Sequence, residues 1–161
     1  MQARRRMTIF EHSSSVWLPR PLEEVFAFFS DAHNLEILTP PWLRFEVLTP
    51  RPIDLAAGVT IDYRLRVRGL PIRWRSEIAA WEPPRRFVDK QIRGPYRLWD
   101  HEHLFREDRG GTFAEDRVSY AVPGGSLVNR LFVAKDVEKI FAFRSEKLRE
   151  LFGSAVGSGS Q

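Results

Sequence analysis

The sequence predicts an α+β protein in which a curved antiparallel sheet of about six or seven strands wraps around a long C-terminal helix. Three observations support this fold class. Five segments with strand character follow one another between residues 58 and 122, separated by turn residues. Several of them alternate apolar and polar residues, which is typical of a sheet with one covered and one wet face. The segment from Ser126 to Phe152 has a helical period and supplies the cover.

Proline and capping residues indicate where the short helices in the N-terminal third begin and end. Pro21 suits the first turn of a helix, and Asp31 can cap a second helical turn. The Thr-Pro-Pro-Trp run at 39–42 ends that turn. The expected elements are a strand over 9–18, a short helix over 22–29, a second short helical turn ending at Leu38, and a strand near 45–48.

The sheet follows from period-2 alternation. The expected strands cover 58–68, 71–81, 86–92, 97–107 and 112–122, and their separators are Gly69, Pro83-Pro84, Gly94-Pro95 and Gly110-Gly111. Apolar Ile61, Tyr63 and Leu65 oppose Asp62 and Arg64, so one face should be covered and the other solvated.

The last segment carries one broad apolar stripe. Its expected members are Val133, Val137, Ile140, Phe141, Leu148 and Leu151. Arg144 interrupts this stripe and therefore faces the sheet. A curved sheet covered by such a helix leaves a hollow between its concave face and the helix.

Composition indicates an ordinary globular protein. The 161 residues are 43% hydrophobic and 29% charged, with a net charge of +4. We expect a single domain over 8–152, with disordered tails at 1–7 and 153–161; Met7 is a second candidate for the first residue.

Several function classes lack support. The absence of cysteine excludes disulfides, thiolate chemistry and Cys-ligated metal. No apolar run is long enough to cross a bilayer, and no secretory leader is recognisable, so a cytoplasmic location without membrane insertion is the default. Apart from the arginines at 4–6 and the alternating arginines over 64–75, the basic residues are spread out. Alternating arginines on a strand are more typical of a solvated face than of a nucleic-acid footprint. Phosphate-loop and nucleophile-elbow motifs are missing.

The strand over 97–107 is the candidate site. Trp99, His101, His103 and Phe105 share one of its faces, and imidazoles framed by aromatic rings are typical of an amphipathic pocket wall. A hairpin turning around Arg109-Gly110 pairs Trp99 with Tyr120, His101 with Val118 and His103 with Asp116. A bulge at the turn would instead bring Glu115 beside His103.

Arg144 requires a counter-charge, because an unpaired buried guanidinium is costly. Asp116, Glu115 or a ligand carboxylate could supply it. Three interpretations of His103, Asp116 and Arg144 stay open, in order of preference: an internal polar network, direct ligand contact, and catalysis.

Metal binding is a weaker interpretation of His101 and His103. A third ligand could be Asp116 or His12, but no spacing requires either one, so no metal is predicted. His12 and His33 are expected at the surface or in loops. Aromatic residues that could line the hollow are Trp42, Tyr63, Trp74, Trp81, Tyr96, Trp99 and Tyr120.

Motifs spread over residues 8–152 resemble the START-like (SRPBCC) superfamily, which has the helix-grip fold and includes polyketide cyclase/dehydrases and coenzyme-Q-binding START-domain proteins. The motifs are Pro21-Leu22-Glu23-Glu24-Val25-Phe26, Leu38-Thr39-Pro40-Pro41-Trp42, Arg93-Gly94-Pro95-Tyr96, Trp99 with His101 and His103, Gly111-Thr112, Asp116-Arg117-Val118, Tyr120 with Pro123-Gly124, and Phe141 to Arg144. The resemblance implies a bacterial domain that binds a lipid, quinone or polyketide-like ligand without a cofactor.

Three functions follow as hypotheses. The favoured one is non-enzymatic binding of a small hydrophobic ligand, by a monomer or dimer. The expected contacts are Tyr63, Trp74, Tyr96, Trp99, His101, His103, Asp116, Tyr120 and Arg144. The second is a cyclase/dehydrase-type lyase or isomerase with His101, His103 and Asp116 as catalytic candidates, in which Arg144 or Tyr120 stabilises an enolate. The third is an accessory domain of an oxidoreductase or epimerase partner.

Overall fold

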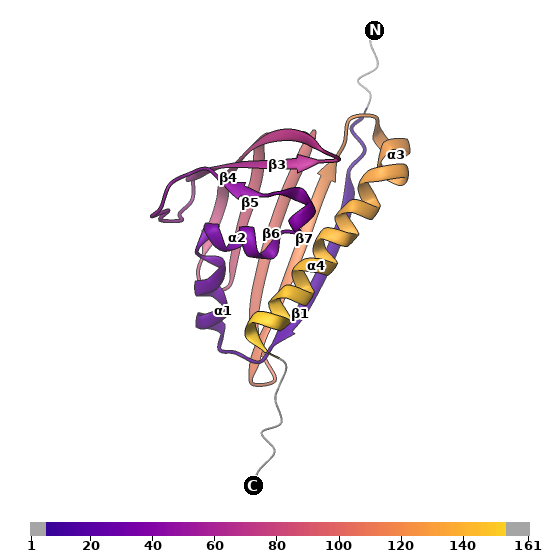
Figure 1. Cartoon of the computed structure of the whole chain (residues 1–161). Helices are drawn as coiled ribbons and strands as arrows, with labels where there is room; N and C mark the ends of the chain where they lie inside the picture. Colours follow the sequence, from indigo (N-terminus) through magenta and orange to yellow (C-terminus); the bar gives the residue numbers. More distant parts are fainter. Residues whose placement is uncertain (1–5, 154–161) are drawn as a thin grey trace.

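A computed structural model describes residues 6–153 and shows the expected α+β architecture (Figure 1). Seven antiparallel strands form one sheet in the order β1-β7-β6-β5-β4-β3-β2. The strands are β1 (Phe10–Leu18), β2 (Glu46–Val47), β3 (Thr60–Val67), β4 (Leu70–Glu82), β5 (Arg86–Arg93), β6 (Leu98–Asp108) and β7 (Gly111–Ala121). Most of the two expected tails, 1–5 and 154–161, lies outside the described residues.

The segment between β1 and β2 contains the two expected helices. They are α1 (Leu22–Phe29) and α2 (Leu35–Leu38), with the 3₁₀ turns η1 (Ala32–Asn34) and η2 (Pro41–Leu43). The carboxylate of Asp31 accepts a hydrogen bond from the backbone N–H of His33 at 3.0 Å, which confirms the predicted cap. Pro41 opens η2, so the Thr-Pro-Pro-Trp run ends α2 as predicted.

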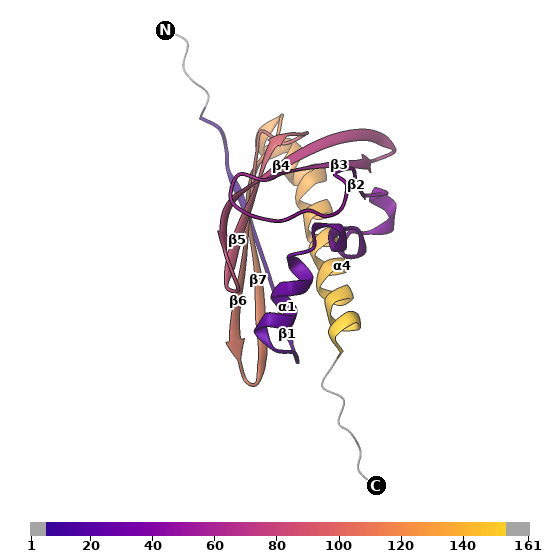
Figure 2. The ribbon, with the colours of Figure 1, turned by 90° about the vertical axis from the view of Figure 1, so that its left-hand side faces the viewer.

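The β6–β7 hairpin has the predicted register. Its turn consists of Arg109 and Gly110, both with positive φ, as a tight two-residue hairpin loop requires. His103 therefore lies opposite Asp116, and the alternative pairing with Glu115 is wrong. Along the β4–β5 pair two register shifts interrupt the ladder. Such irregularities bend a sheet, and the strands curl around α4 (Figures 1 and 2).

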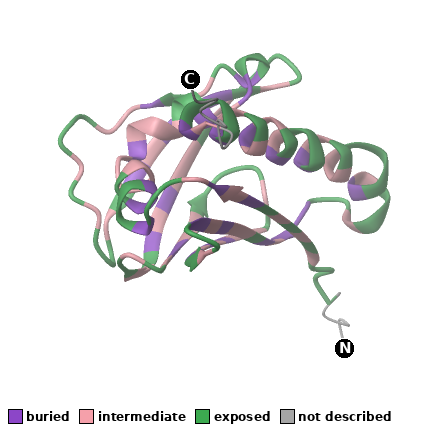
Figure 3. Ribbon diagram, turned by 90° about the horizontal axis from the view of Figure 1, so that it is seen from below, coloured by how far each residue is buried: buried purple, intermediate pink, exposed green. Residues whose placement is uncertain are grey.

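The C-terminal segment is helical throughout but not uniform. It comprises α3 (Gly125–Val128), the single π-turn η3 (Asn129–Val133) and α4 (Ala134–Phe152). The side of α4 that faces the sheet buries Val137, Phe141, Arg144 and Leu148, so the stripe interrupted by Arg144 is confirmed (Figure 3). Leu151 is exposed, which corrects its assignment to the stripe: at the end of α4 the buried position belongs to Phe152, whose ring packs on Phe28.

Three apolar clusters hold the layers together. One joins α1, β1, β6, β7 and the end of α4, and another lies under the β3–β4 hairpin. The third links β7 to the start of α4. None of the described helices is both long and apolar enough to cross a membrane.

Leu148 and Leu151 provide a matched test of this packing. Leu148 is 1% exposed and Leu151 46% exposed on the same helix. We expect Leu148→Ala to lower the free energy of unfolding by about 2–5 kcal/mol, because it leaves a cavity in the core. Leu151→Ala should cost less than about 1 kcal/mol. Urea unfolding followed by circular dichroism measures both, and equal losses would contradict the observed orientation of α4.

Candidate functional site

A cavity of about 920 Å³ lies between the concave face of the sheet and α4. Its walls come from the α1–α2 segment, from β3 to β6 and from α4, and most of them are apolar. The sheet supplies Ile61, Leu65 and Ile72 on one side, and α4 supplies Ile140 and Phe141 on the other. The volume is in the range of small-molecule sites, so the predicted hollow is an open cavity and not a collapsed core.

A buried pair of histidines makes one region of this wall polar. His101 and His103 are two residues apart on β6, so both side chains point to the concave face, as predicted. Both are buried, and their rings stack with centroids 3.7 Å apart. The ring of Phe87 stacks on the other side of His103 at 4.0 Å. Packing on both sides therefore fixes the orientation of the His103 ring.

Asp116 and Arg144 connect the histidines to the covering helix. Asp116 accepts hydrogen bonds from Arg144 Nε at 3.0 Å and from an Nη at 3.2 Å. The carboxylate also lies 2.7 Å from His101 Nε2 and 3.2 Å from His103 Nδ1. Asp116 is thus the counter-charge of Arg144 that the sequence left open among three candidates.

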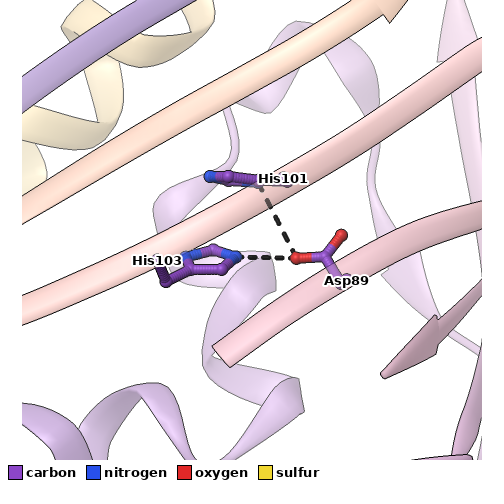
Figure 4. Close-up of side chains that lie close together, drawn as sticks. All are labelled: Asp89, His101 and His103. Atoms are coloured by element: carbon purple, nitrogen blue, oxygen red, sulfur yellow. Dashed lines mark hydrogen bonds and ion pairs between the residues drawn. The ribbon is translucent and has the colours of Figure 1, made fainter. Parts of the chain in front are cut away.

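Asp89 on β5 completes the cluster, and the sequence interpretation missed it. Its Oδ2 is 2.7 Å from His103 Nε2 and 3.8 Å from His101 Nδ1 (Figure 4). One signal could have found it: Asp89 follows Phe87 by two residues, so it shares the inward face of the strand. An acid at an inward position of a sheet that is covered on that side needs a partner.

The charges in the cluster oppose the effect of burial on the pKa values of Asp116 and Asp89. Burial raises the pKa of Asp116, but the charge of Arg144 and hydrogen bonds with the histidines hold it well below the usual range of a carboxyl group. Asp89 also has a lowered pKa, because the bond with His103 and the surrounding positive groups outweigh burial. Both carboxylates are therefore ionised at neutral pH.

The pKa values of the two imidazoles shift in opposite directions. Burial and the neighbouring His103 lower the pKa of His101. Burial also acts against the charged form of His103, but its hydrogen bonds to Asp116 and Asp89 prevail and raise its pKa. Of the two rings, His103 is the one that holds a proton more readily.

The aromatic candidates divide between the cavity wall and the interior. Those that line the cavity are Trp42, Tyr63, Trp74, Tyr96 and Trp99. Trp81 and Tyr120 do not line it; Tyr120 instead donates a buried hydrogen bond to Asn129 at 2.9 Å. Trp74, Tyr96 and Trp99 form one cluster, with ring centroids 4.7–5.5 Å apart. This cluster is an apolar wall of the kind that accommodates flat or aliphatic ligands.

The remaining candidates have distinct positions. Asp116 is not among the residues that line the cavity and lies behind the histidines, whereas Arg144 and Asp89 do line it.

His12 is half-buried with its ring 4.9 Å from Phe141, so its expected surface position is wrong, because β1 packs against α4 there. His33 lies in η1, the expected irregular segment. Among the described residues, Asp89, His101 and His103 could hold a metal ion.

The fold and the cavity define a class of protein: α+β domains that enclose a ligand site between a curled antiparallel sheet and a long C-terminal helix. The chain belongs to the family described as polyketide cyclase/dehydrase and lipid transport, whose model matches residues 10–153. This confirms the START-like resemblance. A comparison with curated proteins finds no match.

Solved structures share the fold at low sequence identity. The protein CV1439 from Chromobacterium violaceum is 15% identical with a TM-score of 0.71, covering 90% of this chain and 99% of that one. The protein Ms6760 from Mycobacterium smegmatis is 17% identical with a TM-score of 0.66, covering 88% and 89%. A nucleoside-diphosphate sugar epimerase from Corynebacterium glutamicum is 26% identical with a TM-score of 0.66; the match covers 86% of this chain but 28% of that one.

The Asp116–Arg144 pair can be tested against a surface pair in the same sheet. Asp116→Asn leaves the buried Arg144 charge without a full partner, and we expect a loss of about 3–5 kcal/mol in the free energy of unfolding. Asp62→Asn removes the partner of the solvent-exposed Arg75 and should cost about 1 kcal/mol or less. Urea unfolding measures both, and similar losses would show that the buried pair contributes no more than the exposed one.

Proposed function

We propose that the protein binds a small hydrophobic ligand with one polar end, of the lipid, quinone or polyketide-like class. The observation that carries this proposal is a cavity of about 920 Å³ whose mostly apolar and aromatic walls include a buried cluster of histidines with Arg144. Apolar walls favour a ligand by removing its surface from water, while a few polar groups fix its orientation. The family description, which names lipid transport, supports the same ligand class.

Arg144 and the histidines are the groups proposed to contact the polar end. Asp116 engages Nε and one Nη of the Arg144 guanidinium, and the other Nη is left to a carbonyl or carboxylate oxygen of the ligand. The faces of Tyr63, Trp74, Tyr96 and Trp99 would contact the apolar part. Asp116 and Tyr120 act from behind the wall: Asp116 orients both His101 and Arg144, and Tyr120 anchors η3 through Asn129.

A filled cavity should lose its ligand affinity. Ile140 lines the cavity from α4, whereas Leu151 lies on the same helix away from it and is exposed. We expect Ile140→Trp to weaken binding of a fluorescent fatty-acid probe roughly tenfold or more, because the indole occupies ligand space. Leu151→Trp is the matched control and should bind like the unchanged protein.

The probe is titrated by fluorescence, and native mass spectrometry of the unheated protein looks for an added mass that is lost in Ile140→Trp. Undiminished probe affinity in Ile140→Trp, or equal weakening in Leu151→Trp, would place binding outside the cavity.

A cyclase/dehydrase-type reaction is the second candidate. The specific observation is that His103 presents Nε2 to Asp89 at the cavity wall while Asp116 and Arg144 meet Nδ1. Because Nε2 donates to the ionised Asp89, His103 can accept a proton from carbon next to a carbonyl group only when the ligand displaces Asp89 from Nε2. Arg144 lies beside it to stabilise the enolate.

The proton-transfer step can be observed without knowledge of the natural substrate. A bound β-diketone in deuterated buffer should exchange its methylene protons for deuterium, and NMR follows the loss of signal. We expect His103→Ala to slow this exchange at least about tenfold, within the usual contribution of a general base. His12→Ala is the control, and an exchange rate unaffected by His103→Ala would exclude this residue as the base.

The partial match to the epimerase supports the third hypothesis, an accessory domain beside an oxidoreductase or epimerase. A pull-down that returns no such enzyme would argue against it.

A further inference from the structure

We propose that Asp89, His101 and His103 form a binding site for one divalent transition-metal ion at the polar wall of the cavity. Each residue offers one ligand atom, and these atoms lie within 4.8 Å of one another. All three residues line the cavity, so an ion there could be reached from the space enclosed by the sheet and α4.

The strongest support comes from which ring nitrogen each histidine turns toward which carboxylate. His101 directs Nε2 to Asp116 at 2.7 Å, which leaves Nδ1 on the side of Asp89. His103 does the reverse: Nδ1 lies 3.2 Å from Asp116, and Nε2 lies 2.7 Å from Asp89. Both rings thus point one nitrogen at Asp116 and the other at Asp89, as Figure 4 shows for the Asp89 side.

This is the arrangement expected of a metal centre with its supporting carboxylate. A histidine that ligates a metal usually donates its second ring N–H to a carboxylate or carbonyl, which fixes the tautomer and orients the ring. Asp116 can serve His101 in this way. For His103 the same role requires Nδ1, which also lies 3.3 Å from an Nη of Arg144, to donate its proton to Asp116. Arg144 in turn holds Asp116 through two hydrogen bonds, so the supporting group is itself fixed.

The ligand atoms lie within 4.8 Å of one another, so binding an ion requires the cluster to adjust around it. Ligand atoms about 2.1 Å from a metal ion lie roughly 3.0–3.4 Å apart, depending on the coordination angle. The 3.8 Å between Asp89 Oδ2 and His101 Nδ1 is slightly wider than this, and the 2.7 Å between Asp89 Oδ2 and His103 Nε2 is slightly narrower. A rotation of the Asp89 side chain, which is 20% exposed toward the cavity, can even out the two distances.

The charge balance accommodates a cation. Both imidazoles must be neutral to bind an ion, so the ion takes the place of any proton on His103. Asp89 and Asp116 then contribute two negative charges against the one positive charge of Arg144 and the two of the ion, and the cluster is net positive. Such a site would attract an anionic or strongly polarised oxygen on a cavity ligand.

The donor set indicates the class of ion. Two imidazole nitrogens and one carboxylate oxygen suit Zn²⁺, Fe²⁺ and Co²⁺ better than Mg²⁺ or Ca²⁺, which prefer oxygen ligands. Three protein ligands leave at least one coordination position free, and here the free side faces the cavity. The site is built on two adjacent strands, where Asp89 pairs with His101 in register, so its geometry does not depend on a loop.

The test uses the complete protein, stripped of metal with a chelator and dialysed, with Co²⁺ as a spectroscopic probe and no organic ligand. We expect one Co²⁺ per chain, with visible absorption bands typical of mixed nitrogen and oxygen coordination, and displacement by Zn²⁺. Asp89→Asn should abolish this binding. Because Asn has nearly the same shape, circular dichroism can verify that the variant folds.

Two further variants distinguish a metal centre from adventitious binding. Asp116→Asn, which removes the supporting carboxylate but no ligand, should weaken Co²⁺ binding about 10–100-fold. His12→Ala changes a half-buried histidine outside the cluster and should leave the affinity unchanged. The proposal is overturned if the stripped protein binds no Co²⁺, if Asp89→Asn binds it as well as the unchanged chain, or if His12→Ala removes the signal. Since no cavity ligand is present, the result does not depend on the proposed ligand binding.

Discussion

One buried ion pair joins the middle of α4 to the sheet. Arg144 lies in the middle of the apolar stripe of α4, where an unpaired guanidinium would be costly, and Asp116 on β7 meets it with two hydrogen bonds. The pair lets the helix cross the sheet at this point although the contact is not apolar. On either side of the pair the helix packs by ordinary hydrophobic burial, through Phe141 and Leu148. The cavity opens where this packing is incomplete.

The same pair gives the cavity a polar wall. Asp116 has more acceptor capacity than Arg144 uses, and the two imidazoles on β6 take up the remainder. Those imidazoles turn their second nitrogens to Asp89. The network of polar contacts that begins at the ion pair therefore extends across three adjacent strands, from β7 through β6 to β5. The side chains that surround the buried charge of Arg144 therefore include groups that face the cavity.

Membership of the family establishes the fold but leaves the chemistry to these side chains. Structures only 15–17% identical to this chain reproduce its architecture over nearly their full length. One fold can hold many unrelated sites, so function has to be argued from the residues on the cavity wall. Here the wall combines a cluster of aromatic rings with Asp89, two imidazoles and one guanidinium. The rings support apolar binding, and the proposals of catalysis and of metal binding rest on the polar groups.

The sequence by itself determined the order of the elements, the wet and covered faces of the sheet and the β6–β7 register, because all three depend on local periodicity and on a two-residue turn. That register placed His103 beside Asp116, and the helical stripe placed Arg144 nearby. The place of Asp89 beside the histidines came only with the tertiary structure. Local alternation indicates that Asp89 faces inward, but the pairing of β5 with β6, which sets Asp89 opposite His101, is not fixed by a tight turn. The exposure of Leu151 was likewise decided by how the end of α4 packs on α1, through the contact of Phe152 with Phe28, residues far apart in the chain.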